Sequence, residues 1–187
     1  MAAAPDNPLP PERLRVMQII AAALLVGVLI FLGIALYVVL IQNQGQGLGP
    51  RRDFPYVTAI AVVLLLVDAP LAVFIPRTIT QNALKQIAAG TWKMPSGMSS
   101  ADATSDAAKL LLVRQTTLII TLALFEGVAF LALIAFLLET EVASLAVVAA
   151  AILLMLVSFP GERRVRAWLD LHLRRVTDLR QQRELQS

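Results

Sequence analysis

Four long apolar stretches constrain this chain more than any other feature of its sequence. They cover approximately residues 16–41, 56–75, 116–138 and 142–159. A helix needs about 20 apolar residues to cross the hydrocarbon core of a bilayer, where backbone polar groups must be satisfied within helices or closed barrels. The sequence therefore predicts an all-α polytopic membrane protein, with a domain of four transmembrane helices over residues 15–160.

The composition agrees with a membrane protein and excludes several kinds of site. Hydrophobic residues make up 58% of the chain and charged residues only 16%, whereas soluble domains carry about 25% charged residues. Cysteine is absent and His172 is the only histidine, so we expect no disulfide, no metal site and no cofactor. The net charge of +3 is typical of topology signals and lipid contacts, and we expect no nucleic-acid partner.

The segments outside the four spans differ in character. Residues 1–14 are rich in proline, which predicts a disordered N-terminal lead. Residues 77–109 form a loop, in which residues 77–89 are predicted to make a short interfacial helix that ends at Gly90. Residues 161–187 are predicted to form a basic amphipathic C-terminal helix.

Lysine and arginine are distributed unevenly among these segments. Nearly all of them lie in the N-terminal lead, the loop 77–109 and the C-terminal segment 161–187. The loop after the first span has only Arg51 and Arg52. Because basic residues accumulate on the cytoplasmic side, both termini and the middle loop are predicted to be cytoplasmic. The expected location is the cell (inner) membrane.

Two carboxylates interrupt the apolar stretches, Asp68 in the second and Glu126 in the third. A charge at the bilayer centre costs at least ~2.5–3.5 kcal/mol on insertion scales, and intramembrane acids usually serve a function. In the predicted topology the two acids lie at comparable depth, where they could meet. Pro70 follows Asp68 by two residues and is predicted to kink the second helix, because proline cannot donate a backbone hydrogen bond.

These acids have two interpretations. As a proton or cation site, Glu126 would carry the proton and Asp68 would be its partner. As structural groups, both would be neutral acids that join helices by hydrogen bonds. The residues alone leave both interpretations open.

The third span resembles a known membrane helix. Its sequence around Glu126, LALFEGVAFLALIAFLL over residues 122–138, is similar to the second helix of the ATP synthase c subunit, the proteolipid. This resemblance implies that Glu126 is the counterpart of that family's ion-binding acid. The chain departs from the family because span 56–75 has no glycine, the following loop is long, and two further spans flank the hairpin. As a whole the chain also resembles four-span bacterial membrane proteins, a likeness that implies no activity.

The C-terminal helix combines an apolar stripe with many arginines. The stripe is predicted either to lie on anionic lipid headgroups, where each cation contributes about 1 kcal/mol, or to pair with another helix as a coiled coil. The candidate residues for contact with the membrane surface or a partner are Arg163, Arg164, Arg166, Trp168, Arg174 and Arg175.

The sequence therefore predicts a membrane protein that is not an enzyme, since no nucleophile–base pair or phosphate loop is visible. The first functional hypothesis is a proton- or cation-binding membrane subunit that uses Glu126 and Asp68. The alternative is a structural or assembly protein of a larger membrane complex. The expected partners are the lipid bilayer with its anionic headgroups, and further copies of the chain or a larger complex.

Overall fold

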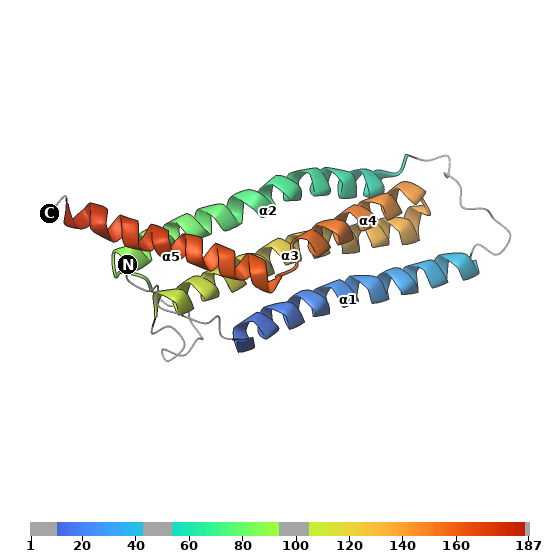
Figure 1. The fold of residues 1–187 in the computed structure, drawn as a ribbon. Helices are drawn as coiled ribbons and strands as arrows, with labels where there is room; N and C mark the ends of the chain where they lie inside the picture. The colour runs from blue at the N-terminus through green and yellow to red at the C-terminus, as the bar shows by residue number, and fades with distance from the viewer. Residues whose placement is uncertain (1–10, 43–53, 94–104, 186–187) are drawn as a thin grey trace. The chain divides into compact units, whose positions relative to one another are not determined.

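The computed structural model describes residues 11–42, 54–93 and 105–185, and these residues form helices and short connections without any strand. The helices can be followed by colour in Figure 1: α1 (Pro11–Gln42), α2 (Tyr56–Ala88), α3 (Asp106–Glu139), α4 (Val142–Val157) and α5 (Glu162–Glu184). The all-α class predicted from the sequence is confirmed.

The chain divides into two compact units, and three of the long helices contribute to both. Unit 1 comprises Met1–Gln18, Ile75–Leu118 and Pro160–Ser187. Unit 2 comprises Ile19–Phe74 and Ile119–Phe159. Each unit thus combines parts of α1, α2 and α3 with one shorter helix, α5 in unit 1 and α4 in unit 2.

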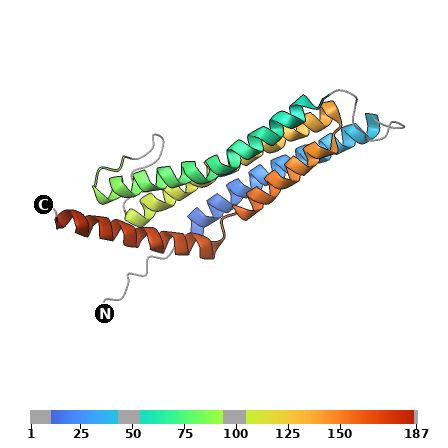
Figure 2. The same ribbon diagram turned by 90° about the horizontal axis from the view of Figure 1, so that it is seen from above.

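Unit 2 is a bundle whose four helical parts run alongside one another in both views (Figures 1 and 2). Its interior is apolar and small-residue rich, with Ala35, Ala129 and Ala151 fully buried. Large apolar side chains such as Leu66 and Phe74 point outward, with 69% and 64% of their surface exposed. An apolar exterior of this kind is suited to lipid contact rather than to water.

In the described part of the chain, three to four helices are long and apolar enough to cross a membrane. α1, α2 and α3 each meet the requirement within their own length. α4 has 16 residues, which corresponds to about 24 Å and is shorter than the ~30 Å hydrocarbon core. The prediction of four spans is thus confirmed for three helices, and α4 reaches spanning length only together with α5.

One prediction about α2 is wrong. Residues 77–88 are helical, as expected, but they do not form a separate interfacial helix, because α2 continues through Pro70 and Pro76 as far as Ala88. Pro76 leaves the carbonyl of Ala72 without its helical donor, and the hydroxyl of Thr121 in α3 donates a hydrogen bond to that carbonyl at 3.5 Å. A threonine on a neighbouring helix therefore compensates for the missing bond.

The helix ends differ from the prediction in one further place. α1 begins at Pro11, so residues 11–14 belong to a helix and not to the predicted disordered lead, whose residues 1–10 lie outside the described part. Proline is tolerated there because the first turn has no internal donor to lose. The predicted end at Gly90 is confirmed by its positive φ of 69°, and the predicted C-terminal helix is confirmed as α5.

Candidate functional site

Glu126 lies on the side of α3 that packs against α1. Its Oε1 atom is 3.9 Å from the position that a Cβ atom would occupy on Gly27. One helical turn further along both helices, the rings of Phe31 and Phe130 pack edge to face at 5.4 Å. These two contacts show that α1 and α3 run parallel here, with the carboxyl group half-buried beside a glycine.

Asp68 lies at the same height along the helix bundle as Glu126, but Glu126 does not face it. Two contacts define how α2 faces α3, one from Thr121 to Ala72 and one from Glu139 to Thr58. Interpolation between them puts Asp68 at the height of Glu126, as the sequence predicts. Helical periodicity, however, places Glu126 about 140° around α3 from Thr121, so Glu126 faces α1 instead of α2.

Within the part of the chain that the structure describes, neither acid forms a hydrogen bond or ion pair. Pro70 frees the carbonyl of Leu66, but Glu126 donates no hydrogen bond to it. The helix runs through Pro70 without a break. The structure thus leaves Asp68 and Glu126 as two separate half-buried carboxyl groups.

A third carboxylate of unit 2, that of Glu139, has a clear structural role. Glu139 at the end of α3 accepts hydrogen bonds from the backbone N–H groups of Val57 and Thr58 at 2.7 and 2.9 Å. The Thr58 hydroxyl donates a further bond at 2.6 Å. Glu139 therefore caps the N-terminus of α2 from another helix, where a negative charge also complements the helix dipole.

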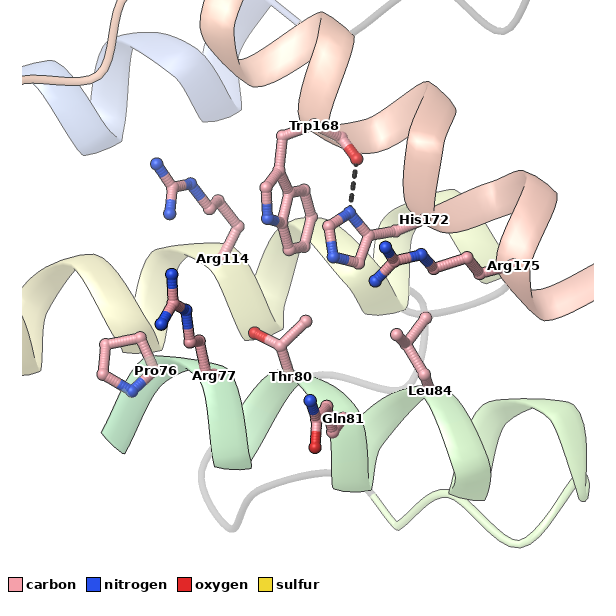
Figure 3. Close-up of a pocket in the computed structure, with 9 residues that line it drawn as sticks. All are labelled: Pro76, Arg77, Thr80, Gln81, Leu84, Arg114, Trp168, His172 and Arg175. Carbon is pink, nitrogen blue, oxygen red and sulfur yellow. Dashed lines mark hydrogen bonds between the residues drawn. The ribbon is translucent and has the colours of Figure 1, made fainter. Parts of the chain in front are cut away.

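Unit 1 contains a cavity that sequence reasoning missed. Its volume is about 320 Å³, and α2, α3 and α5 supply its walls (Figure 3). The lining residues are Pro76, Arg77, Thr80, Gln81, Leu84, Arg114, Trp168, His172 and Arg175. Among the described residues, its lining has three arginines and no carboxylate, so the cavity is cationic.

Trp168 and His172 form a stacked pair on the α5 wall of this cavity. Their ring centres are 4.1 Å apart, and the Nδ1–H group of His172 donates a hydrogen bond to the Trp168 carbonyl at 2.6 Å (Figure 3). The guanidinium carbon of Arg114 lies 5.6 Å from the Trp168 ring centre, a cation–π distance. Burial lowers the pKa of His172, and the nearby Arg175 and Arg114 lower it further, which outweighs the Trp168 carbonyl.

The remaining tail residues divide into packed and exposed groups. Four residues of the apolar stripe are buried within unit 1, namely Val165, Leu169, His172 and Val176, so this part of the stripe packs against the chain itself. Trp168, expected at the membrane surface, faces the cavity. The candidate residues that stay on the outside of α5 are Arg163, Arg164, Arg166 and Arg174.

No family model, curated protein or solved structure matches this chain. Among the described residues, no group of three or more histidine, cysteine, aspartate or glutamate side chains could hold a metal ion. The two features of the described residues that bear on function are the carboxyl group of Glu126 and the arginine-lined cavity.

Proposed function

We propose that this membrane protein is a non-enzymatic subunit that binds a proton or cation at Glu126. The observation that supports the proposal is the position of this carboxyl group within the apolar part of α3, half-buried beside Gly27 and without a hydrogen-bond partner in the described residues. A charge at such a depth is costly, so the neutral acid is the stable form until a cation or a proton acceptor arrives.

The contact with Gly27 gives this proposal a physical basis. A glycine on the facing helix leaves open space beside the carboxyl oxygen, because no side chain fills it. A group that must gain and lose a proton needs such access, whereas a purely structural acid is normally held by a donor or acceptor on its neighbour. The resemblance of the surrounding sequence to the proteolipid helix supports the same role.

The role proposed for Asp68 differs from the one predicted from the sequence. Because Glu126 faces α1, Asp68 is not its direct partner. Its equal height on α2 is compatible with a second, separate proton-binding group along the same bundle. We therefore assign Glu126 the main role and treat Asp68 as an independent carboxyl group.

Carbodiimide labelling tests the proposal directly. The protein in liposomes would be treated across a range of pH, and the modified residue would be located by mass spectrometry. We expect selective labelling of Glu126 that declines as the pH rises, because carbodiimides react with the protonated acid. Glu126→Gln should abolish this labelling and Asp68→Asn should preserve it. Absence of labelling at every pH would contradict the proposal.

A pair of glycine variants sharpens the experiment. Gly27→Leu should fill the space beside the Glu126 carboxyl group and reduce its labelling several-fold. Gly33→Leu is the matched control on the same helix, because a Cβ atom there would have no neighbour within 4 Å. If both variants label like the original chain, access to Glu126 does not depend on α1.

A structural or assembly role is the second candidate, and one contact favours it. Glu126 lies where α1 and α3 pack together, and a polar group at such a contact can join helices in a membrane. In that case Glu126→Gln should leave the size of the complex unchanged, because glutamine can still form hydrogen bonds. Glu126→Leu should instead weaken the association of α1 with α3. Co-purification with a fixed larger complex would support this candidate.

The proposed location is the cell membrane with both termini in the cytoplasm. The distribution of lysine and arginine supports this orientation. Reporter fusions to the C-terminus, one active only in the cytoplasm and one active only outside it, would test it. Activity of the external reporter would reverse the assignment.

A further inference from the structure

Some arginines of α5 pair with an acidic side chain. Arg166 pairs with Glu162 at 2.6 Å, and Arg180 pairs with Asp106 at 2.7 Å. Within the described residues, Arg77, Arg114 and Arg175 form no ion pair, although all three line one cavity of about 320 Å³. Three like charges around one space favour an anion as the missing partner.

We propose that this cavity binds a phosphate group, with the guanidinium groups of Arg77, Arg114 and Arg175 as its ligands. This inference goes beyond the proposed role of Glu126 and does not depend on it. Guanidinium groups match phosphate geometry because their N–H donors form a planar fork that binds two oxygens at once. The three arginines come from three helices, α2, α3 and α5, so they approach the cavity from different directions (Figure 3).

The other lining groups are also suited to such a ligand. Thr80 and Gln81 offer neutral donors from α2. Leu84 and Trp168 supply apolar surface to the lining, which suits the glycerol and upper acyl part of a lipid better than a fully hydrated ion. The volume is at the lower end of the ~300–1,000 Å³ typical of small-ligand pockets, which is enough for a headgroup.

The position of the arginines in the sequence indicates which phosphate is expected. Arg77 directly follows the apolar run that closes at Pro76, and Arg114 directly precedes the run that begins near Thr116. Both residues therefore belong at the boundary of apolar segments, the depth at which tryptophan and lipid phosphates also concentrate. An anionic phospholipid headgroup fits this depth better than free phosphate.

Trp168 provides a direct readout, since Arg114 lies over its ring. The chain has two tryptophans, so the Trp92→Phe variant isolates the fluorescence of Trp168. The full-length variant in non-ionic detergent would be titrated separately with short-chain phosphatidic acid, short-chain phosphatidylcholine and inorganic phosphate. We expect a saturable change with phosphatidic acid at lower concentration than with the other two probes.

Charge-removing variants identify the site. Arg77→Gln and Arg175→Gln should each weaken the binding of phosphatidic acid by about tenfold, the effect expected from one charge-assisted hydrogen bond. Arg175 is exposed, so its variant should fold even if a change at Arg77 disturbs α2. Arg174→Gln is the matched control, because it removes the same charge from the neighbouring position of α5 outside the cavity lining, and it should change the affinity less than twofold.

The outcomes separate the possible sources of the phosphate. Saturation by phosphatidic acid alone supports a lipid headgroup, and equal saturation by inorganic phosphate supports a free phosphate at the same arginines. The proposal is overturned if no probe saturates. It is also overturned if Arg174→Gln weakens binding as much as Arg175→Gln, because the effect would then reflect the general charge of α5.

Discussion

Unit 1 and unit 2 organise their charged groups in opposite ways. In unit 2 the carboxyl groups of Asp68 and Glu126 stand apart on different helices, each without a partner in the described residues. In unit 1 three guanidinium groups surround a single cavity. The apolar unit thus keeps these two acids apart, whereas the polar unit gathers cations of the same sign around its cavity.

The two sets of groups differ in how their charge can be neutralised. A single carboxyl group in an apolar bundle becomes neutral by holding a proton, which requires no other residue. Three guanidinium groups cannot become neutral near physiological pH, so their mutual repulsion persists until an anion binds. We therefore expect changes in unit 2 to alter proton-dependent behaviour and changes in unit 1 to alter anion-dependent behaviour.

The largest expected loss of stability comes from Glu139, the acid of unit 2 that does have partners. Glu139→Ala removes the acceptor for two N–H groups at the start of α2 and for the Thr58 hydroxyl. The loss of a helix cap costs about 1–2 kcal/mol, and Thr58 is buried, with 4% of its surface exposed. Unfolding of the purified protein in mixed micelles would measure the change.

Two variants test whether the hydrogen bonds are responsible. Glu139→Gln keeps one acceptor oxygen and should lose less stability than the alanine variant. Glu141→Ala removes a carboxylate two residues later whose side chain caps nothing, so it should be nearly neutral. Equal losses at both positions would show that the charge of this turn matters and the cap does not.

The next effect, smaller than the first, concerns the charged contacts of unit 1. Arg180 pairs with Asp106 and donates to the carbonyl of Ile87 at 3.4 Å, so it joins α5 to α3 and α2. Arg180→Gln should lower the free energy of unfolding by up to about 1 kcal/mol, with a smaller loss at high salt. Arg166→Gln breaks an exposed pair within α5 alone and should cost about 0.3–0.5 kcal/mol. A larger loss for Arg166→Gln would contradict the joining role of Arg180.

The sequence predicted most of the fold because hydrophobic length and turn residues determine it. The apolar runs marked the helices, and Gly90 marked the end of α2. The prediction failed at Pro76, where a proline usually ends a helix. The bond from Thr121 to the carbonyl of Ala72 joins residues far apart in the sequence, so no local pattern could reveal that the helix continues.

The candidate sites were predictable only in part, for a similar reason. Depth along a helix follows from counting residues, and it identified Glu126 and Asp68 as level. The direction in which each faces depends on which helix packs beside it, and the contact of Glu126 with Gly27 was therefore not foreseen. In the sequence, Arg77 and Arg114 lie at segment boundaries and His172 lies on the apolar stripe of the C-terminal helix. Only the packing of three helices brings these residues to one cavity.

The smallest expected effect is a pH dependence from His172. Burial, with the charges of Arg175 and Arg114, lowers its pKa from the ordinary value of 6.5, and Arg77 faces the same cavity from α2. The folded state then binds fewer protons than the unfolded state just below pH 6.5, so stability should fall as the pH drops from 6.5 through the lowered pKa.

His172→Gln tests this contribution, because glutamine does not titrate. The variant should lose less stability than the original chain between pH 8 and pH 5, as measured by unfolding in detergent. An identical pH dependence would exclude His172 as its source. Bound phosphate adds a sharper test, since an anion between the arginines offsets the charges that disfavour protonated His172. Short-chain phosphatidic acid should therefore reduce the acid sensitivity of the original chain and leave that of His172→Gln unchanged, which would link the histidine to the cationic cavity of unit 1.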